Sequence, residues 1–135
     1  MLTMALIKQT AARAAEAASQ IPCAMTIAIV DSGANLAYLE RMDDAMAGSV
    51  ETATRKARCA MLFKRPTKAF EDALAGGRMA ILSLPDVLPI EGGIPLIHNG
   101  EIVGAIGVSG GTAPQDGYVA TAAAEAFARM GEKSS

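Results

Sequence analysis

The sequence predicts an α+β fold in which helices cover one antiparallel sheet. Two pairs of apolar, strand-length segments are each separated by a few turn-forming residues, and strands joined by tight turns run antiparallel. Segments with helical spacing of apolar residues lie at both ends of the chain and in its middle. The 135 residues are close to the commonest domain size, so we expect one domain over residues 1–135.

The first third of the chain is predicted to form a helix and a hairpin. Residues 2–19 are rich in alanine, the strongest helix former, and Pro22 cannot continue a helix. The apolar runs 25–30 and 36–41 have strand length, and residues 31–35 between them carry the Asp, Ser, Gly and Asn typical of turns.

The middle of the chain predicts two helices and a weaker strand. Apolar residues recur at helical spacing over 49–63, with Ser49 as the expected N-cap. Pro66 interrupts this pattern, and a short helix is expected over 67–74. A further strand is predicted around 87–90, after a turn.

The second hairpin carries the most informative pattern of the chain. Residues 94–97 and 101–108 are apolar runs, and Asn99-Gly100 between them favours a type I′ turn, in which both central residues need positive φ. A closing helix is expected over 113–130. The predicted order is therefore α-β-β-α-α-β-β-β-α, with a five-stranded antiparallel sheet.

Glycines within and around this hairpin predict a close approach. Gly104 and Gly107 interrupt the second strand, where a glycine is expected if another backbone, a helix or a ligand must come near. One glycine pair precedes the hairpin and another follows it, so its rim is the predicted pocket. The expected ligand-binding residues there are Gly92, Gly93, Pro95, Ser109, Gly110, Gly111 and Thr112.

Four motifs in a fixed order resemble those of one protein family. They are Ile29-Val30-Asp31-Ser32-Gly33 with Arg41-Met42-Asp43, then Thr54-Arg55-Lys56-Ala57-Arg58, then Phe63-Lys64-Arg65-Pro66-Thr67, and finally Glu91-Gly92-Gly93-Ile94-Pro95 with Gly104-Ala105-Ile106-Gly107-Val108-Ser109-Gly110-Gly111.

These motifs resemble the GlcG/HbpS-like family of heme-binding or heme-degrading proteins, over about residues 2–130. The resemblance implies a five-stranded sheet of profilin-like or PAS-like outline, heme as a candidate cofactor and a homo-oligomer. It also places the histidine heme ligands of family members near the N-terminal helix, where this sequence has no histidine. Other conceivable iron ligands are Tyr38, Tyr118, Thr112, the two cysteines and the eight methionines.

Composition limits the partners and the setting. A formal charge of −2 gives no electrostatic footprint for nucleic acid, and no apolar run reaches the roughly 18 residues of a membrane span. The N-terminus lacks a signal-peptide layout, and two cysteines are too few for a disulfide scaffold, so a cytoplasmic protein is expected. With 51% hydrophobic residues, we expect it to bury apolar surface in a homo-oligomer.

A cluster of basic side chains suggests how an anion could be held. Arg58 borders the apolar stripe of the 49–63 helix, and its guanidinium could bind a carboxylate or a heme propionate. The alternative is a solvated helix face. The cluster consists of Arg55, Lys56, Arg58, Lys64, Arg65 and Lys68.

Three residues are candidates for proton transfer. Glu91 and Asp116 are the carboxylates nearest the predicted pocket, and His98 is the only imidazole. The structural alternatives are that Asp116 caps the start of the closing helix and that His98 flanks a turn with its ring in solvent. No cluster with metal-ligand spacing and no established nucleotide-binding or nucleophile motif is present.

The sequence therefore supports three functional hypotheses. The first is a binding protein for heme or another flat anionic cofactor, held between the glycine-rich hairpin and the basic helix. The second is a metal-independent enzyme acting on a hydroxy acid or related carboxylate, in which Arg58 binds the carboxylate and Glu91, Asp116 or His98 moves a proton. The third is an accessory subunit of an oligomer.

Overall fold

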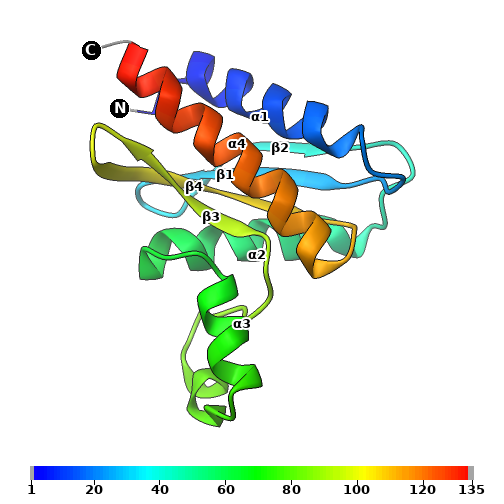
Figure 1. Cartoon of the computed structure of the whole chain (residues 1–135), viewed down its shortest axis with the longest axis vertical. Helices are drawn as coiled ribbons and strands as arrows, with labels where there is room; N and C mark the ends of the chain where they lie inside the picture. Colours follow the sequence, from blue (N-terminus) through cyan, green and yellow to red (C-terminus); the bar gives the residue numbers. More distant parts are fainter. Residues whose placement is uncertain (1, 134–135) are drawn as a thin grey trace.

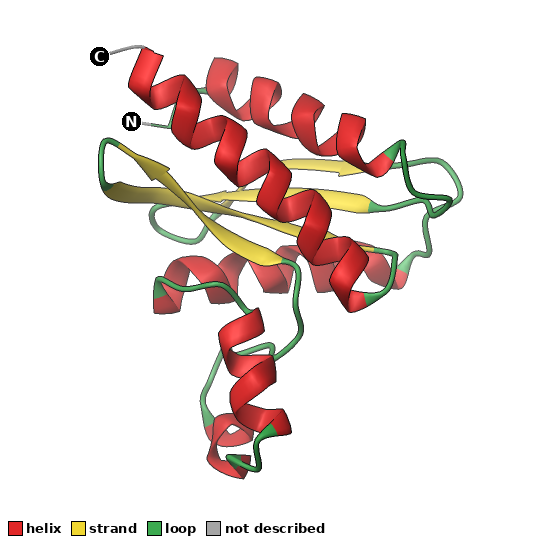
Figure 2. Cartoon of the chain, viewed as in Figure 1, coloured by secondary structure: helices red, strands yellow, loops and turns green. Residues whose placement is uncertain are grey.

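The computed structural model describes residues 2–133, which form a sheet between two layers of helices (Figures 1 and 2). Helices α1 and α4 lie side by side on one face of the sheet, α2 covers the other, and α3 projects beyond α2. The elements are α1 (Met4–Ala18), β1 (Thr26–Asp31), β2 (Leu36–Arg41), α2 (Gly48–Phe63), α3 (Lys68–Ala75), the 3-10 helix η1 (Met79–Ser83), β3 (Gly93–His98), β4 (Glu101–Ser109) and α4 (Ala113–Lys133).

The sheet is antiparallel, with the strand order β2-β1-β4-β3. The predicted α+β class is therefore confirmed, but the predicted fifth strand is wrong. Residues 87–90 form no strand: Val87 is buried with Cys59, Phe70 and Ile81 in a small separate cluster. The Leu88 amide donates to the Cys59 sulfur at 3.5 Å, so the segment is held by α2 and not by a neighbouring strand.

The hairpin between β3 and β4 has the expected turn. Asn99 and Gly100 both adopt positive φ, at 51° and 81°, and His98 pairs with Glu101 across the turn. This is the type I′ geometry that matches the twist of the two strands.

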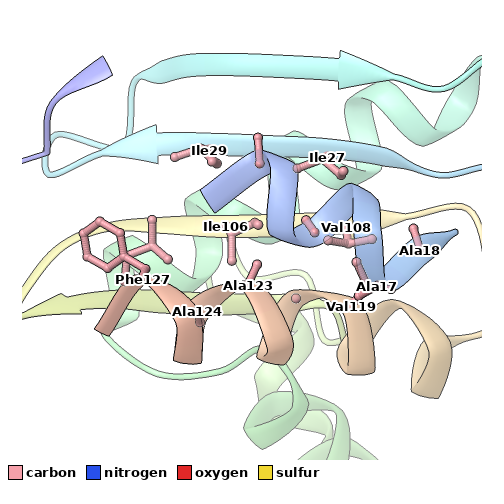
Figure 3. Close-up of a cluster of buried hydrophobic side chains, with 14 of the residues drawn as sticks. Ala17, Ala18, Ile27, Ile29, Ile106, Val108, Val119, Ala123, Ala124 and Phe127 are labelled. Atoms are coloured by element: carbon pink, nitrogen blue, oxygen red, sulfur yellow. The ribbon is translucent and has the colours of Figure 1, made fainter. Parts of the chain in front are cut away.

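Small residues dominate the core above the sheet. Ala14, Ala120 and Ala123 are fully buried between the helices and the strands, and Figure 3 shows Ala123 facing Ile106 across this layer. Because alanine side chains are short, α1 and α4 can lie close both to each other and to the sheet. Phe127 is the largest apolar side chain buried there.

Glycine in β4 permits the approach of a helix on the opposite face. A Cβ atom at Gly107 would overlap the carbonyl oxygen of Ala53 and approach the amide of Ala57, both in α2. The sequence predicted that another backbone, a helix or a ligand approaches Gly107, and in the structure it is the helix α2.

Two helix ends differ from the expectation. Helix α2 begins after Ala47, and Ser49 does not cap it; the Ser49 hydroxyl instead shares a 2.7 Å hydrogen bond with Thr26 of β1. Helix α4 continues through Gly131 to Lys133 instead of ending before it, and the glycine leaves room there for the His98 ring. No helix within residues 2–133 is long and apolar enough to cross a membrane.

Gly107→Ala is expected to lower the free energy of unfolding by about 2–3 kcal/mol, because the added methyl group overpacks the contact between α2 and β4. Gly48→Ala is the matched control, since nothing lies within 4 Å of a Cβ atom at that position. Urea denaturation measures both variants. Equal stability of the two would contradict the close packing of α2 on β4.

Candidate functional site

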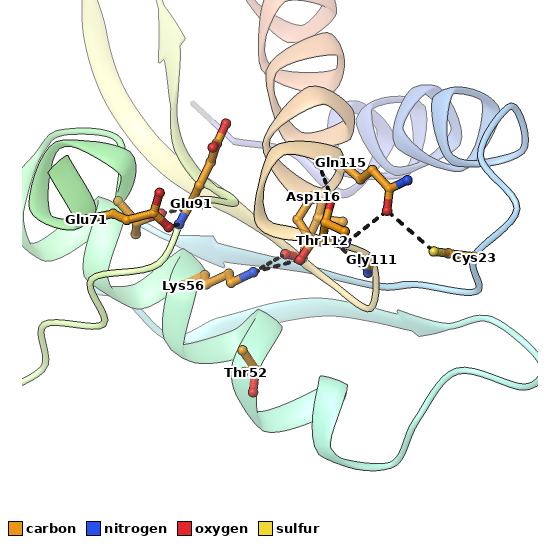
Figure 4. Close-up of polar contacts among 12 residues, drawn as sticks. Cys23, Thr52, Lys56, Glu71, Glu91, Gly111, Thr112, Gln115 and Asp116 are labelled. Atoms are coloured by element: carbon orange, nitrogen blue, oxygen red, sulfur yellow. Dashed lines mark hydrogen bonds and ion pairs between the residues drawn. The ribbon is translucent and has the colours of Figure 1, made fainter. Parts of the chain in front are cut away.

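A buried ion pair lies where the two glycine pairs come together (Figure 4). The Lys56 ammonium is 3.0 Å from an Asp116 carboxylate oxygen, and the two side chains are only 2% and 3% exposed. Lys56 also donates to the carbonyl of Val108 at 3.0 Å, and the second oxygen of Asp116 accepts from the Gly111 amide at 2.9 Å. The pair thereby joins α2, the end of β4 and the start of α4.

Gly92 and Gly93, at the start of β3, both lie against Lys56. A Cβ atom at Gly92 would lie 2.8 Å from the Lys56 ammonium nitrogen, and one at Gly93 would overlap the Lys56 carbonyl oxygen. The Gly92 carbonyl in turn accepts from the Val108 amide at 2.9 Å. These glycines therefore fit closely around a lysine that the sequence interpretation had placed only in a general basic cluster. The burial of Lys56 could have been inferred from the sequence, because Lys56 lies among the buried residues Ala53, Ala57 and Ala60 of α2.

The loop before α4 is tied into the fold as well. Thr112 and Gln115 form a reciprocal capping box, with hydrogen bonds of 2.9 and 3.3 Å. Gly110 has a φ of +141°, and its Cα faces the backbone of Ala24 and Met25. The structure brings Ser109–Thr112 close to Gly92-Gly93, but the Lys56 side chain lies between the two segments. Contact of these residues with a ligand stays a prediction.

Open space lies along the outward face of α4. A groove of about 580 Å³ is lined by Glu91, Pro114, Gly117, Tyr118, Thr121, Ala122 and Glu125. An adjoining, more apolar groove of about 360 Å³ shares Thr121 and Glu125 with it. The other residues lining this second groove are Pro66, Ile94, Pro95, Ile97, Ala124 and Ala128.

Of the three candidates for proton transfer, Glu91 alone lines either of these two grooves. Its carboxylate lies against Gly117, where a Cβ atom would overlap it. Asp116 lies in the first turn of α4, where it accepts from the Gly111 amide just before the helix as its expected capping role implies. It is also held in the buried ion pair with Lys56, a contact that the sequence did not indicate.

His98 is not simply directed into solvent, contrary to the structural alternative considered for it. Its ring is tilted against Phe127, with centroids 6.3 Å apart, and a Cβ atom at Gly131 would lie 2.6 Å from its Nδ1 atom. That nitrogen is buried and has no hydrogen-bond partner among the described residues. The imidazole therefore packs on the C-terminal part of α4, outside both grooves.

Arg58 lies apart from the glycine pairs. Its guanidinium donates to the carbonyl of Ala34, at 2.6 Å, in the turn between β1 and β2. That end of the sheet is where Gly104 pairs with Asp31. The Gly92 contact with Val108 is four residues away along β4, or roughly 13 Å at the rise of a strand. Arg58 therefore does not converge with the glycines, with Glu91 or with Asp116.

The described residues also contain no group of three or more His, Cys, Asp or Glu side chains that could hold a metal ion. Cys59 is buried and Cys23 is half-buried, and neither forms a disulfide within this part of the chain. Burial raises the pKa of the Cys59 thiol, which keeps it protonated and unreactive.

The fold and the grooves define a small α+β domain with a ligand-sized surface along one helix. The family model described as "Haem degrading protein HbpS-like" matches residues 2–125, and the chain belongs to this family. Protein GlcG of Escherichia coli strain K12 is 39% identical over 114 residues, which cover 81% of this chain and 85% of GlcG.

Solved structures share the fold over most of the chain. A double mutant of Streptomyces reticuli HbpS superposes with a TM-score of 0.84 at 31% identity, covering 93% of this chain and 86% of that one. The crystal structure of a PduOC–heme complex gives a TM-score of 0.83 at 29% identity, covering 93% and 94%. The resemblance found in the sequence motifs is thus confirmed.

Lys56→Met and Asp116→Leu are each expected to lower the free energy of unfolding by about 3–5 kcal/mol, because each leaves one charge buried without its partner. The double variant should be more stable than either single variant, since it removes both charges. Lys68→Met is the control, because its ion pair with Asp72 is exposed and screened by water, so its loss should change the stability little. Denaturant titrations of the wild type, the two single variants, the double variant and the control measure these changes. If the loss of unfolding free energy in the double variant equals the sum of the two single losses, Lys56 and Asp116 are not coupled.

Proposed function

We propose that this protein binds heme, or another flat anionic cofactor, on the outward face of α4. Membership of the HbpS-like family supports the ligand class, and a protein of the same fold has been crystallised with heme. The observation that carries the location is the groove of about 580 Å³ beside Tyr118, a volume in the usual range for small-molecule sites. A cytoplasmic setting is part of this proposal.

The residues of this face fit a flat, largely apolar ligand. Ala122 presents little side chain, so a planar ring can approach the helix closely there. Tyr118 is 55% exposed at the edge of the groove, and a tyrosine oxygen is one of the protein ligands known for heme iron. Heme bound there would supply a redox-active iron, and Tyr118 would hold it at the helix surface.

The other tyrosine is less suited to this role. The Tyr38 hydroxyl donates to Glu40 at 2.9 Å, and this hydrogen bond, together with burial, raises the pKa of Tyr38. Its phenol is therefore held in the protonated form, and it belongs to β2, away from α4. Tyr118 is the better donor of the two.

Tyr118→Phe is expected to weaken hemin binding and to shift the Soret maximum, because it removes the oxygen that would bind the iron. Tyr38→Phe is the matched control, and His98→Ala should also bind as the wild type does, since the imidazole packs against α4 outside both grooves. Hemin titrations followed at the Soret band measure all four proteins. No spectral change with the wild type would reject the heme proposal and favour the carboxylate-processing enzyme, with Glu91 as its base.

We further propose that the protein is a homo-oligomer, as the composition predicts. Large apolar side chains are exposed on η1 and the segment after it: Met79 is 64%, Leu82 59% and Leu84 42% exposed. Strand β3 is also an open sheet edge, with Ile97 44% exposed.

Light scattering at micromolar concentration is expected to give a multiple of the chain mass, and Leu82→Glu should reduce the measured mass. A strictly monomeric wild type would contradict this proposal.

A further inference from the structure

A third groove lies on the other side of Tyr118, between α1 and α4. It has a volume of about 190 Å³, and Tyr118 and Ala122 line both it and the groove that contains Glu91. The two grooves therefore adjoin at Tyr118 and Ala122. The residues of the third groove that matter below are Arg13, Glu16, Ala17, Ala126 and Arg129.

This third groove carries a net positive charge. Arg13 faces Glu16 at 3.6 Å, too long for a strong hydrogen bond, and both side chains are more than half exposed. Arg129 forms no ion pair with a residue of the range 2–131, over which the structure describes the side chains. Two guanidinium groups and one carboxylate thus leave one positive charge here, in a chain whose formal charge is −2.

The groove on the opposite side of Tyr118 carries a negative charge. Glu91 and Glu125 both line the larger groove, and no lysine or arginine is among the residues lining it. An anionic group on a ligand at Tyr118 is repelled on the Glu91 side and attracted on the Arg13 side. The charge distribution therefore favours one orientation of an asymmetric anion across the helix.

Alanine side chains form part of the floor of the third groove. Ala17 and Ala126 are buried where α1 and α4 pack against each other, and they offer methyl groups only. A planar ring system can extend from Tyr118 over these alanines toward Arg13 and Arg129. Guanidinium groups hold carboxylates in pairs of parallel hydrogen bonds, which makes them well suited to such a ligand edge.

We infer that Arg13 and Arg129 bind the carboxylates of the ligand that lies on α4, the role that the sequence had suggested for Arg58. This assignment rests on the proposed function. It specifies the ligand as a flat ring system with its carboxylates on one edge, oriented with that edge toward α1. Arg58 takes no part, because it is bonded to Ala34 at the far end of the sheet.

The test compares hemin with hemin dimethyl ester, which has the same iron and ring but no carboxylates. Affinities are measured by Soret titration for the wild type, the double variant R13Q/R129Q and the control R55Q/R78Q. The control removes the same charge from two other exposed positions. Circular dichroism verifies that the variants are folded, which we expect because all four side chains are exposed.

The wild type should bind hemin about tenfold more tightly than the ester, the size expected for charge-assisted hydrogen bonds that are partly exposed to solvent. R13Q/R129Q should bind hemin as weakly as the wild type binds the ester, and should no longer distinguish the two ligands. R55Q/R78Q should behave as the wild type does.

Two results would overturn the inference in distinguishable ways. If R13Q/R129Q retains the wild-type preference for hemin over the ester, the arginine assignment is wrong while heme binding stands. If the wild type gives no Soret response to hemin, the proposed function and the assignment both fail.

Discussion

The buried contact between Lys56 and Asp116 is the constraint on which the arrangement of this molecule depends. Helices α2 and α4 lie on opposite faces of the sheet, and this ion pair joins them around the end of β4. A charged pair without water must have its hydrogen bonds satisfied, or it costs several kcal/mol. The Val108 carbonyl and the Gly111 amide provide them. The ion pair therefore fixes the end of β4, the loop before α4 and the α4 helix together.

The glycines around this contact follow from the same requirement. A side chain at Gly92 would displace the lysine ammonium, and one at Gly93 would strike the backbone of Lys56. The glycine-rich motif is thus explained in large part by packing around Lys56. A motif of this kind indicates a close approach, and only the three-dimensional arrangement shows that the approaching group is a lysine of the same chain.

Small side chains have a second consequence, on the outside of the molecule. Because the interior layer between α1, α4 and the sheet is filled with alanine and aliphatic residues, the two helices pack close to the strands. Open grooves lie on the surface of α4, where Ala122 and Ala126 present short side chains. Such a surface suits a planar ligand, and the charges on its two sides would set the orientation of that ligand.

The sequence by itself determined what depends on neighbouring residues. The Asn99-Gly100 turn, the two hairpins and most of the helical segments follow from local conformational preference, and the motifs were sufficient to identify the family. Residues 87–90 were predicted incorrectly because an apolar run is equally suited to a strand and to burial against a helix, and only α2 and α3 decided the outcome.

The candidate site required the tertiary structure, because its parts are distant in the chain. Lys56 and Asp116 are 60 residues apart in the chain, and the local sequence around Lys56 does not predict which residue it pairs with. Arg58 is only two positions further along α2, yet helical geometry turns it toward the β1–β2 turn. Arg13 and Arg129 come from opposite ends of the sequence and line one groove only because α1 packs beside α4. Local propensity cannot specify such contacts, which arise when distant segments bury their apolar faces together.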